Sequence, residues 1–261
     1  MKSIMFDLLK IIFLLLLPIS VSALPSFGKV TAKSWVVSDG NGRILDGDNI
    51  DSIRSIASIT KVMTSMIVLD AQQNLDEYIK PYTRRELIQL AMVRSDNQAS
   101  LILCDRYPGG RQACHNAMNA KAAELGMTST KFIESSGLRA ENVSTARDLI
   151  KLAIAAQHYP EIVKASKSPH IKISVSTKKW LIFNNTNPII GKRHDILVSK
   201  TGWIRASGGC LLMLLDTDIG KRVVIVLNSD NTRTRIPEAE FLLEYVRDDE
   251  QQLPHWSMGL Y

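Results

Sequence analysis

The chain has 261 residues, with 32 Lys and Arg against 26 Asp and Glu, a formal net charge of +6 and 45% hydrophobic residues. This composition is typical of a folded globular protein and excludes disordered, collagen-like and coiled-coil chains. The basic residues interleave with acidic ones and form no basic stripe with aromatic residues, so we expect no nucleic-acid partner.

The N-terminal segment differs from the rest of the chain. Two lysines precede or flank an apolar run at residues 11–17, and a proline and a stretch of small residues follow it. The run is shorter than the roughly 20 residues that a helix needs to span a bilayer. We therefore predict a signal peptide over residues 1–23, cleaved after Ala23, that leaves no stable membrane anchor. The alternative is an uncleaved membrane anchor.

One compact domain is expected over residues 24–250, with a short tail at 251–261, because no repeat, low-complexity tract or long linker interrupts the remaining sequence. The domain begins with a hairpin that turns at the Gly and Asn cluster of residues 39–42. A helix over residues 58–71 is apolar nearly all round and should be buried. Thr83 and Glu86 then form a capping box that begins the next helix.

The second half of the domain changes from helices to strands. Two helices flank the turn at 108–110, Thr145 caps another, and a last helix is predicted over 237–246 with proline in its first turn. Strands are predicted at 171–176, 195–201, 210–216 and 222–227. This order predicts an α/β fold of the α+β type, in which a largely antiparallel sheet is flanked by helices on both faces.

The first chemical motif is Ser58 with Lys61, at the start of the apolar helix. Residues three apart lie on one helical face, so the two side chains can touch. A serine is a strong nucleophile only beside a base, and burial or a second cation lowers a lysine pKa enough for that role. The same spacing at Ser176 and Lys179 lies in a strand-like segment, where the side chains would point to opposite faces.

Two further motifs follow. Ser95 and Asn97 offer a hydroxyl that can relay a proton and a carboxamide that can hold a peptide group. A second Ser-Asp-Asn copy at 229–231 is interpreted as a turn.

At the end of a predicted strand, Lys200 supplies a cation and Thr201 a hydroxyl for a carboxylate. Gly202 lets another backbone come close.

The ordered set S-x-x-K, S-x-N and K-T-G is typical of penicillin-binding proteins and class A β-lactamases. Over roughly residues 25–247 the chain resembles low-molecular-mass penicillin-binding proteins, the serine DD-peptidases, and within them the D-alanyl-D-alanine endopeptidase branch. The segments that carry this resemblance are 55–64, 107–110, 137–138, 142–149, 185–187 and 199–202. The resemblance implies a β-lactamase/transpeptidase-like fold, a periplasmic location and hydrolysis of D-alanyl bonds in peptidoglycan stem peptides, with β-lactam antibiotics as acylating inhibitors.

The resemblance also implies roles for individual residues. Ser58 would be the acylated nucleophile, Lys61 its general base and Ser95 a proton shuttle to the leaving amine. The implied substrate-binding residues are Asn97, Lys200, Thr201, Gly202 and Trp203. Backbone N–H groups of Ser58 and Trp203 would form the oxyanion hole.

Two features depart from the family pattern. Only 36 residues lie between Ser58 and Ser95, and the missing stretch falls near residues 79–82. Trp203, directly after K-T-G, is a large aromatic residue that could line the groove or pack against the domain.

Cys104 and Cys114 flank the turn at 108–110 and could form a disulfide in an oxidising compartment; the alternative is two buried thiols. Cys210 would be free and buried. The five histidines have no metal-ligand spacing, so we expect no metal or cofactor.

Other functions remain open at the level of sequence. A serine β-lactamase of class A would carry a Glu-x-x-Leu-Asn pentapeptide, which does not occur in this sequence. A D-alanyl-D-alanine carboxypeptidase would carry a further β-domain and membrane anchor after the last helix, for which residues 247–261 are too few. A catalytically idle wall-binding module is disfavoured by the complete motif set. The modest positive charge suits an anionic wall.

Overall fold

The computed structural model describes residues 30–176, 179–193 and 195–252, so the predicted signal peptide and most of the predicted tail lie outside the described residues. The centre of the fold is a five-stranded antiparallel sheet with the strand order β2-β1-β11-β10-β9. Its strands are β1 (Ser34–Asp39), β2 (Ile44–Asp48), β9 (Ile196–Ile204), β10 (Gly208–Thr217) and β11 (Gly220–Ser229). The strand β9, which carries Lys200 and Gly202, therefore lies at one edge of the sheet.

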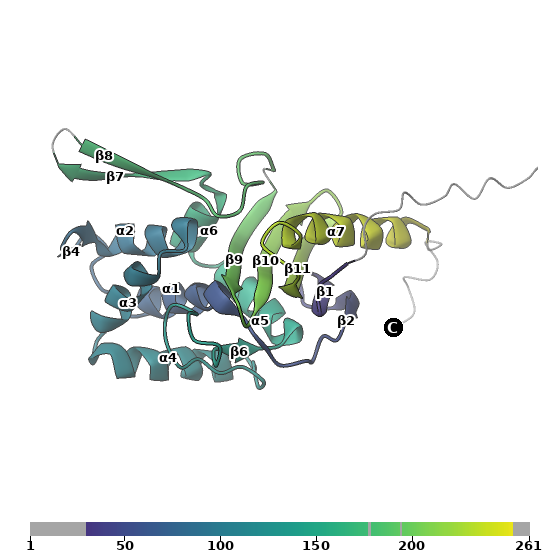
Figure 1. Cartoon of the computed structure of the whole chain (residues 1–261), viewed down its shortest axis with the longest axis horizontal. Helices are drawn as coiled ribbons and strands as arrows, with labels where there is room; N and C mark the ends of the chain where they lie inside the picture. Colours follow the sequence, from purple (N-terminus) through teal and green to yellow (C-terminus); the bar gives the residue numbers. More distant parts are fainter. Residues whose placement is uncertain (1–29, 177–178, 194, 253–261) are drawn as a thin grey trace, which may run out of the picture.

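Both faces of this sheet are buried, which explains why its central strands are apolar without alternation. Val36, Leu212 and Ile225 belong to one core cluster, together with helices α1 (Thr60–Asp70) and α5 (Ala146–Ala156). Val224 and Met213 point to the other face, where α7 (Arg235–Gln252) covers them. Figure 1 shows α7 lying along one side of the sheet, opposite the larger group of helices.

The remaining helices build the layer around α1, which is buried on almost every side. They are the 3-10 helix η1 (Ala57–Ile59), α2 (Arg84–Gln89), the π-helix η2 (Leu90–Arg94), α3 (Asn97–Asp105), α4 (Gly110–Glu124) and α6 (Pro160–Lys167). Three short ribbons complete the described structure: β3 (Arg54–Ser55) with β6 (Val143–Ser144), β4 (Tyr78–Ile79) with β5 (Tyr82–Thr83), and β7 (His170–Ser176) with β8 (Lys179–Asn184).

The structure confirms the predicted antiparallel sheet with helices on both faces, and the caps that were expected. The Thr83 hydroxyl accepts a hydrogen bond from the Glu86 N–H, the Thr83 N–H donates one to the Glu86 carboxylate, and Thr145 caps α5. The last helix begins two residues before the predicted start, at Arg235, and runs on to Gln252. A short hairpin, β4–β5, pairs Tyr78 with Thr83 and Ile79 with Tyr82, the region where a shortening relative to the family was expected.

A disulfide joins Cys104, near the end of α3, to Cys114 on α4, and Cys210 is free and buried. Closing a loop of this size is expected to stabilise the domain by about 2–3 kcal/mol. The double variant Cys104→Ala/Cys114→Ala should lower the urea midpoint accordingly, with Cys210→Ala as the matched control. Thiol titration of the oxidised, denatured protein should find one thiol without reductant and three with it; three thiols in both cases would contradict the pairing.

Candidate active site

Ser58 lies in η1, directly before α1, and Lys61 lies in the first turn of α1. The Lys61 Nζ is 2.7 Å from the Ser58 Oγ, as the spacing of three residues predicted. Ala57, the residue before Ser58, has a φ of 45°, which is unusual for a residue with a side chain. This turn is held in a strained conformation, a feature that concentrates at functional sites.

Lys61 is fully buried and makes three polar contacts. Its Nζ donates to the Asn97 Oδ1 at 2.8 Å and to the Ser136 carbonyl, in addition to meeting the Ser58 hydroxyl. Burial lowers the pKa of Lys61 to about 7, against the opposing charges of Glu134 and Asp96. A neutral amine can donate to the two carbonyl oxygens and direct its lone pair at the Ser58 hydroxyl, which is the geometry of a general base.

Ser95 and Asn97 reach the site through an irregular helix junction. The π-helix η2 ends at Ser95, whose backbone is left-handed with a φ of 62°. Asp96 then caps α3 by accepting a hydrogen bond from the Ala99 N–H, and Asn97 is the first residue of that helix. The left-handed backbone of Ser95, between two helices, brings the Ser95 hydroxyl to Lys200 and the Asn97 side chain to Lys61. Short π-helical segments frequently occur at functional sites.

Lys200 and Thr201 come from the edge strand β9. The Lys200 Nζ donates to the Ser95 Oγ at 2.9 Å, and the Thr201 Oγ1 donates to the Thr186 Oγ1 at 2.6 Å. Burial, together with the charges of Lys61 and Arg235, lowers the pKa of Lys200 well below its usual value. Lys200 is close enough to Lys61 for the two amines to interact, but burial is what lowers the pKa of Lys61, and the nearby charges of Glu134 and Asp96 oppose it.

Two glycines let the backbone close around Ser58. A Cβ on Gly202 would lie 3.0 Å from the Ser58 nitrogen, and a Cβ on Gly137 would lie 1.9 Å from the Ala57 carbonyl oxygen. Gly137 also has a φ of 80°, so only glycine fits that position without strain. The loop at 134–138 and the edge strand β9 thus approach the nucleophile from two sides.

Glu134, to which no sequence motif pointed, organises this loop. Its carboxylate accepts hydrogen bonds from the Ser136 N–H and hydroxyl at 2.6 Å, from the Gly137 N–H and from the Asn142 side chain at 3.1 Å. Through these contacts it fixes the Ser136 carbonyl that accepts from Lys61. A lone glutamate in a loop carries no periodic signal, so only its position close to a glycine could have drawn attention.

Arg235 is a second residue of the site that no sequence motif indicated. It is the first residue of α7 and is buried, and one guanidinium nitrogen donates to the Gly202 carbonyl. Its Nε is buried without a hydrogen-bond partner. Its charge acts on the site, because it is one of the causes that lower the pKa of Lys200.

Two further features that the sequence singled out, Trp203 and the second Ser-Asp-Asn copy, lie at the surface and in a turn. The Trp203 side chain is 53% exposed, so it does not pack in the core. The second Ser-Asp-Asn copy forms the turn between β11 and α7, where the Asn231 side chain accepts from the Arg233 N–H. Among the described residues, no group of three His, Cys, Asp or Glu side chains could hold a metal ion.

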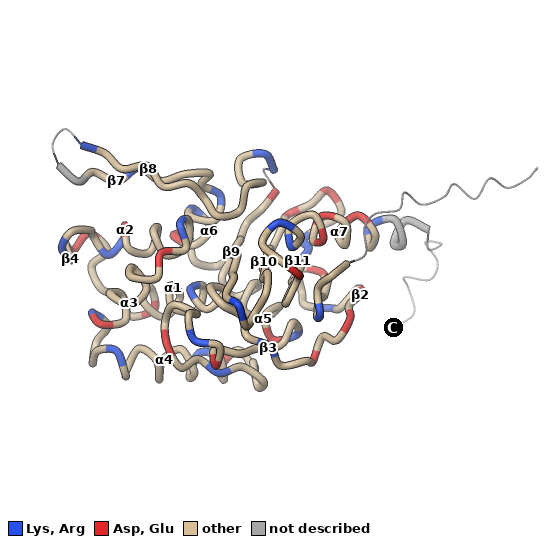
Figure 2. The backbone as a smooth tube through the Cα atoms, viewed as in Figure 1, with Lys and Arg blue, Asp and Glu red and all other residues tan. Residues whose placement is uncertain are grey.

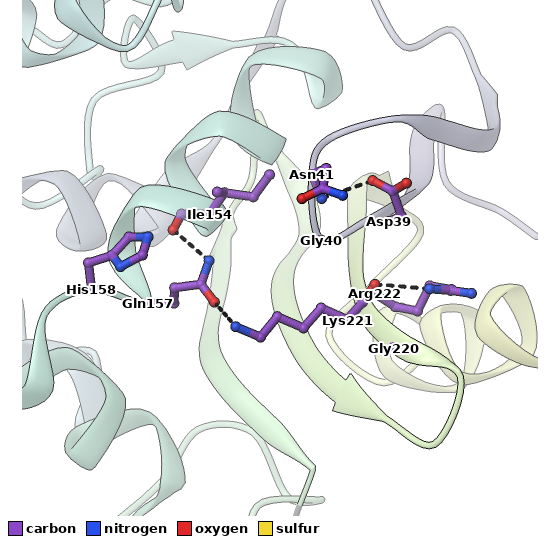
Figure 3. A pocket seen from close by; sticks show the side chains of 9 residues that line it. All are labelled: Asp39, Gly40, Asn41, Ile154, Gln157, His158, Gly220, Lys221 and Arg222. Carbon is purple, nitrogen blue, oxygen red and sulfur yellow. Dashed lines mark hydrogen bonds between the residues drawn. The ribbon is translucent and has the colours of Figure 1, made fainter. Parts of the chain in front are cut away.

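A cavity of about 550 Å³ lies elsewhere in the domain (Figure 3). It is lined by Asp39, Gly40, Asn41, Ile154, Gln157, His158, Gly220, Lys221 and Arg222. Lys221 donates to the Gln157 side chain at 2.7 Å, and Asp39 accepts from the Asn41 N–H at 2.9 Å. The cavity holds none of the predicted site residues and no serine beside a base, so it is not the candidate active site.

Comparison with known proteins gives one consistent family. The peptidase S11 family, described as D-alanyl-D-alanine carboxypeptidase, matches residues 20–80 and 77–231. The D-alanyl-D-alanine endopeptidase of Pseudomonas aeruginosa is 34% identical, with 86% of this chain and 80% of the relative covered. The Escherichia coli K12 protein of the same name is 33% identical, with 83% and 77% covered.

Solved structures share the fold. Penicillin-binding protein D2 from Listeria monocytogenes, in its ampicillin-bound form, has a TM-score of 0.74 and 28% identity, with 84% of this chain and 98% of that chain covered. The Streptomyces K15 DD-transpeptidase has a TM-score of 0.77 at 23% identity, with 85% and 98% covered, and supports the fold alone. Within the described residues, no helix is long and apolar enough to cross a membrane.

Proposed function

Since the chain belongs to the D-alanyl-D-alanine carboxypeptidase family, peptidase S11, we propose that it cleaves peptide bonds of D-alanine through an acyl-enzyme on Ser58. The protein is a serine DD-peptidase that acts on peptidoglycan and binds penicillin. The observation that carries the proposed mechanism is the 2.7 Å contact between the Ser58 hydroxyl and a buried Lys61 whose pKa is about 7.

In the first step, neutral Lys61 takes the proton of the Ser58 hydroxyl while the Oγ attacks the carbonyl carbon of the scissile bond. The developing negative charge on the carbonyl oxygen is stabilised by the backbone N–H groups of Ser58 and Trp203. Because β9 is an edge strand, the substrate backbone can lie alongside it in an extended conformation.

In the second step, the leaving amine needs a proton. Ser95 lies within hydrogen-bond distance of Lys200, and Asn97 of Lys61, so Ser95 can pass a proton to the amine while Asn97 holds the substrate amide. Expulsion of the amine leaves an ester between Ser58 and D-alanine. Water then attacks this ester and releases the shortened peptide.

A negatively charged substrate fits the electrostatics of the site. Lys200 is fully buried, and its pKa is lowered by burial and by the neighbouring cations Lys61 and Arg235. A carboxylate that binds beside Lys200 and Thr201 would favour the charged form of that lysine. Peptidoglycan stem peptides and β-lactam antibiotics both carry such a carboxylate, so both are expected to bind in the same orientation.

We propose that the preferred substrate is a D-alanyl cross-link, so that the enzyme is an endopeptidase. The endopeptidases among the relatives are 32–34% identical to this chain, whereas the D-alanyl-D-alanine carboxypeptidases are 25–28% identical. Digestion of purified cross-linked muropeptides tests this: loss of dimers supports an endopeptidase, and release of terminal D-alanine alone supports a carboxypeptidase.

The proposal includes export. A signal peptide over residues 1–23 would deliver the domain at 24–250 to the periplasm, where peptidoglycan lies and where the disulfide can form. The N-terminal sequence of the protein recovered from a periplasmic extract tests this location. A start at Leu24 supports cleavage, and a retained N-terminus in the membrane fraction contradicts it.

The variant Ser58→Ala is expected to lose covalent labelling by fluorescent penicillin completely, because the substitution removes the hydroxyl that forms the acyl-enzyme. The matched control is Ser176→Ala, which removes the serine of the second S-x-x-K pattern in the sequence. That variant should label at the wild-type rate. Labelling is read on a denaturing gel and the site by mass spectrometry of the labelled peptide. Unchanged labelling of Ser58→Ala would refute the assigned nucleophile.

A further inference from the structure

The segment around the β7–β8 hairpin has a charge composition unlike the rest of the domain. Residues 162–193 contain seven Lys and Arg and no Asp or Glu, and they lie in the longest stretch of the predicted domain without an acidic residue. Figure 2 shows the same asymmetry in space, with basic and no acidic positions along the described part of the hairpin. A surface of this kind attracts a negatively charged partner.

One face of the hairpin also exposes apolar side chains. On β8, Trp180 is 52% exposed and Ile182 is 62% exposed. Lys172 lies opposite Ile182 in the register, and its Nζ is 4.9 Å from the centre of the Trp180 ring. His170 and Asn184 are paired on the same face and are exposed. These five positions and Ser174, which lies opposite Trp180, make six residues in three cross-strand pairs, which we call the outer hairpin face.

The opposite face of the hairpin is anchored to the active site. Ile173 is buried, and the Phe183 ring lies 4.8 Å from the guanidinium carbon of Arg94, the residue directly before Ser95. After β8 the chain continues to Thr186, whose N–H donates to the Val93 carbonyl and whose hydroxyl accepts from Thr201. The outer hairpin face is therefore continuous along the chain with the residues that bind substrate.

We propose that the outer hairpin face binds the peptidoglycan polymer beyond the scissile bond, with Trp180 stacking on a sugar or peptide face and Lys172 pairing with a stem-peptide carboxylate. This inference rests on the proposed function, because it extends the substrate from the active site along the hairpin. The polymer offers carboxylates at regular intervals, which match a segment that has no acidic residue. The Trp180 ring offers a large apolar face for stacking, and the Lys172 ammonium beside it can pair with an anion.

The test compares an intact polymer with a small substrate. The variant Trp180→Ala/Lys172→Ser is measured in a pelleting assay with purified sacculi and in a penicillin acylation assay. The matched control, Tyr78→Ala/Lys33→Ser, removes an aromatic side chain and a lysine that are also exposed but lie outside the hairpin. We expect sacculus affinity to fall at least about fivefold in the hairpin variant alone, and acylation to stay at the wild-type rate in both.

The outcomes separate the two proposals. Wild-type binding to sacculi should also weaken as salt is raised, because the surface is cationic. Equal sacculus binding by the hairpin variant and the control would overturn the inference while leaving the enzyme's function intact. Binding of the wild type to anionic phosphatidylglycerol vesicles but not to sacculi would also overturn it, in favour of a membrane surface. Absence of Ser58 acylation with the binding difference preserved would instead refute the proposed catalytic function.

Discussion

Replacing Lys61 with methionine is expected to reduce the rate of Ser58 acylation by about 10²–10⁴-fold, the usual contribution of a positioned general base. Methionine has a similar length and suits a buried position, so the helix α1 should remain packed. The loss would then reflect the missing base. Stopped-flow acylation with a chromogenic cephalosporin measures the rate, and circular dichroism checks that the variant is folded. A folded variant that acylates at the wild-type rate would exclude Lys61 as the base.

The pH dependence of the wild-type acylation rate tests the role of Lys61 as the base a second time. Only neutral Lys61 can accept the proton, so the rate should fall about tenfold per pH unit below the Lys61 pKa of about 7. Besides Lys61, the charged groups that face this position are Glu134, Asp96 and Lys200. Because the Glu134 carboxylate raises the pKa of Lys61, Glu134→Gln should move this acidic limb to lower pH. Glu134→Asp, which keeps the charge, should restore it; a limb that stays in place would contradict the coupling.

The variant Gly137→Ala is expected to destabilise the domain by about 3–5 kcal/mol and to abolish penicillin labelling. An added Cβ would lie 1.9 Å from the Ala57 carbonyl oxygen and 2.9 Å from the Ser58 nitrogen, so the loop or the nucleophile turn must move. The Ser136 carbonyl would move with the loop and lose its contact with Lys61. Urea unfolding gives the stability, and labelling gives the activity.

Gly110 is the matched control for this prediction. Its φ of 77° is close to that of Gly137, but a Cβ there meets nothing within 4 Å. The variant Gly110→Ala therefore carries only the cost of a left-handed conformation, about 1–2 kcal/mol, and should keep wild-type labelling. Equal effects of the two variants would show that backbone conformation alone, and not contact with the nucleophile turn, determines the loss.

Local spacing explains which parts of the site were predictable. Ser58 and Lys61 lie on one helical turn, so their contact follows from a separation of three residues. The caps at Thr83 and Thr145 follow from side-chain chemistry in the same way. Contacts between distant segments could be predicted only from the order of the three motifs. Lys200 and Ser95 are far apart in the sequence, so no local spacing rule predicts their contact.

Other features had no local signal. Glu134 acts through loop geometry, and Arg235 acts through the approach of a helix start to β9. The strand β8 was missed because Trp180 to Phe183 is a continuous apolar run, while the structure exposes two of these side chains and half-buries the other two. Helix α6 was missed because its eight residues give only a short periodic signal.

The burial of Lys61 affects folding as well as catalysis. Its folded-state pKa of about 7 lies below the usual 10.5, so unfolding takes up a proton between these pH values, and the free energy of unfolding should rise with pH across that interval. At neutral pH, burial of the Lys61 amine therefore lowers the free energy of unfolding, and an apolar residue at this position would not carry that cost. A laboratory selection for heat resistance alone would favour sequences that have discarded their catalytic base, so improved variants of this enzyme must be chosen for turnover and thermostability together.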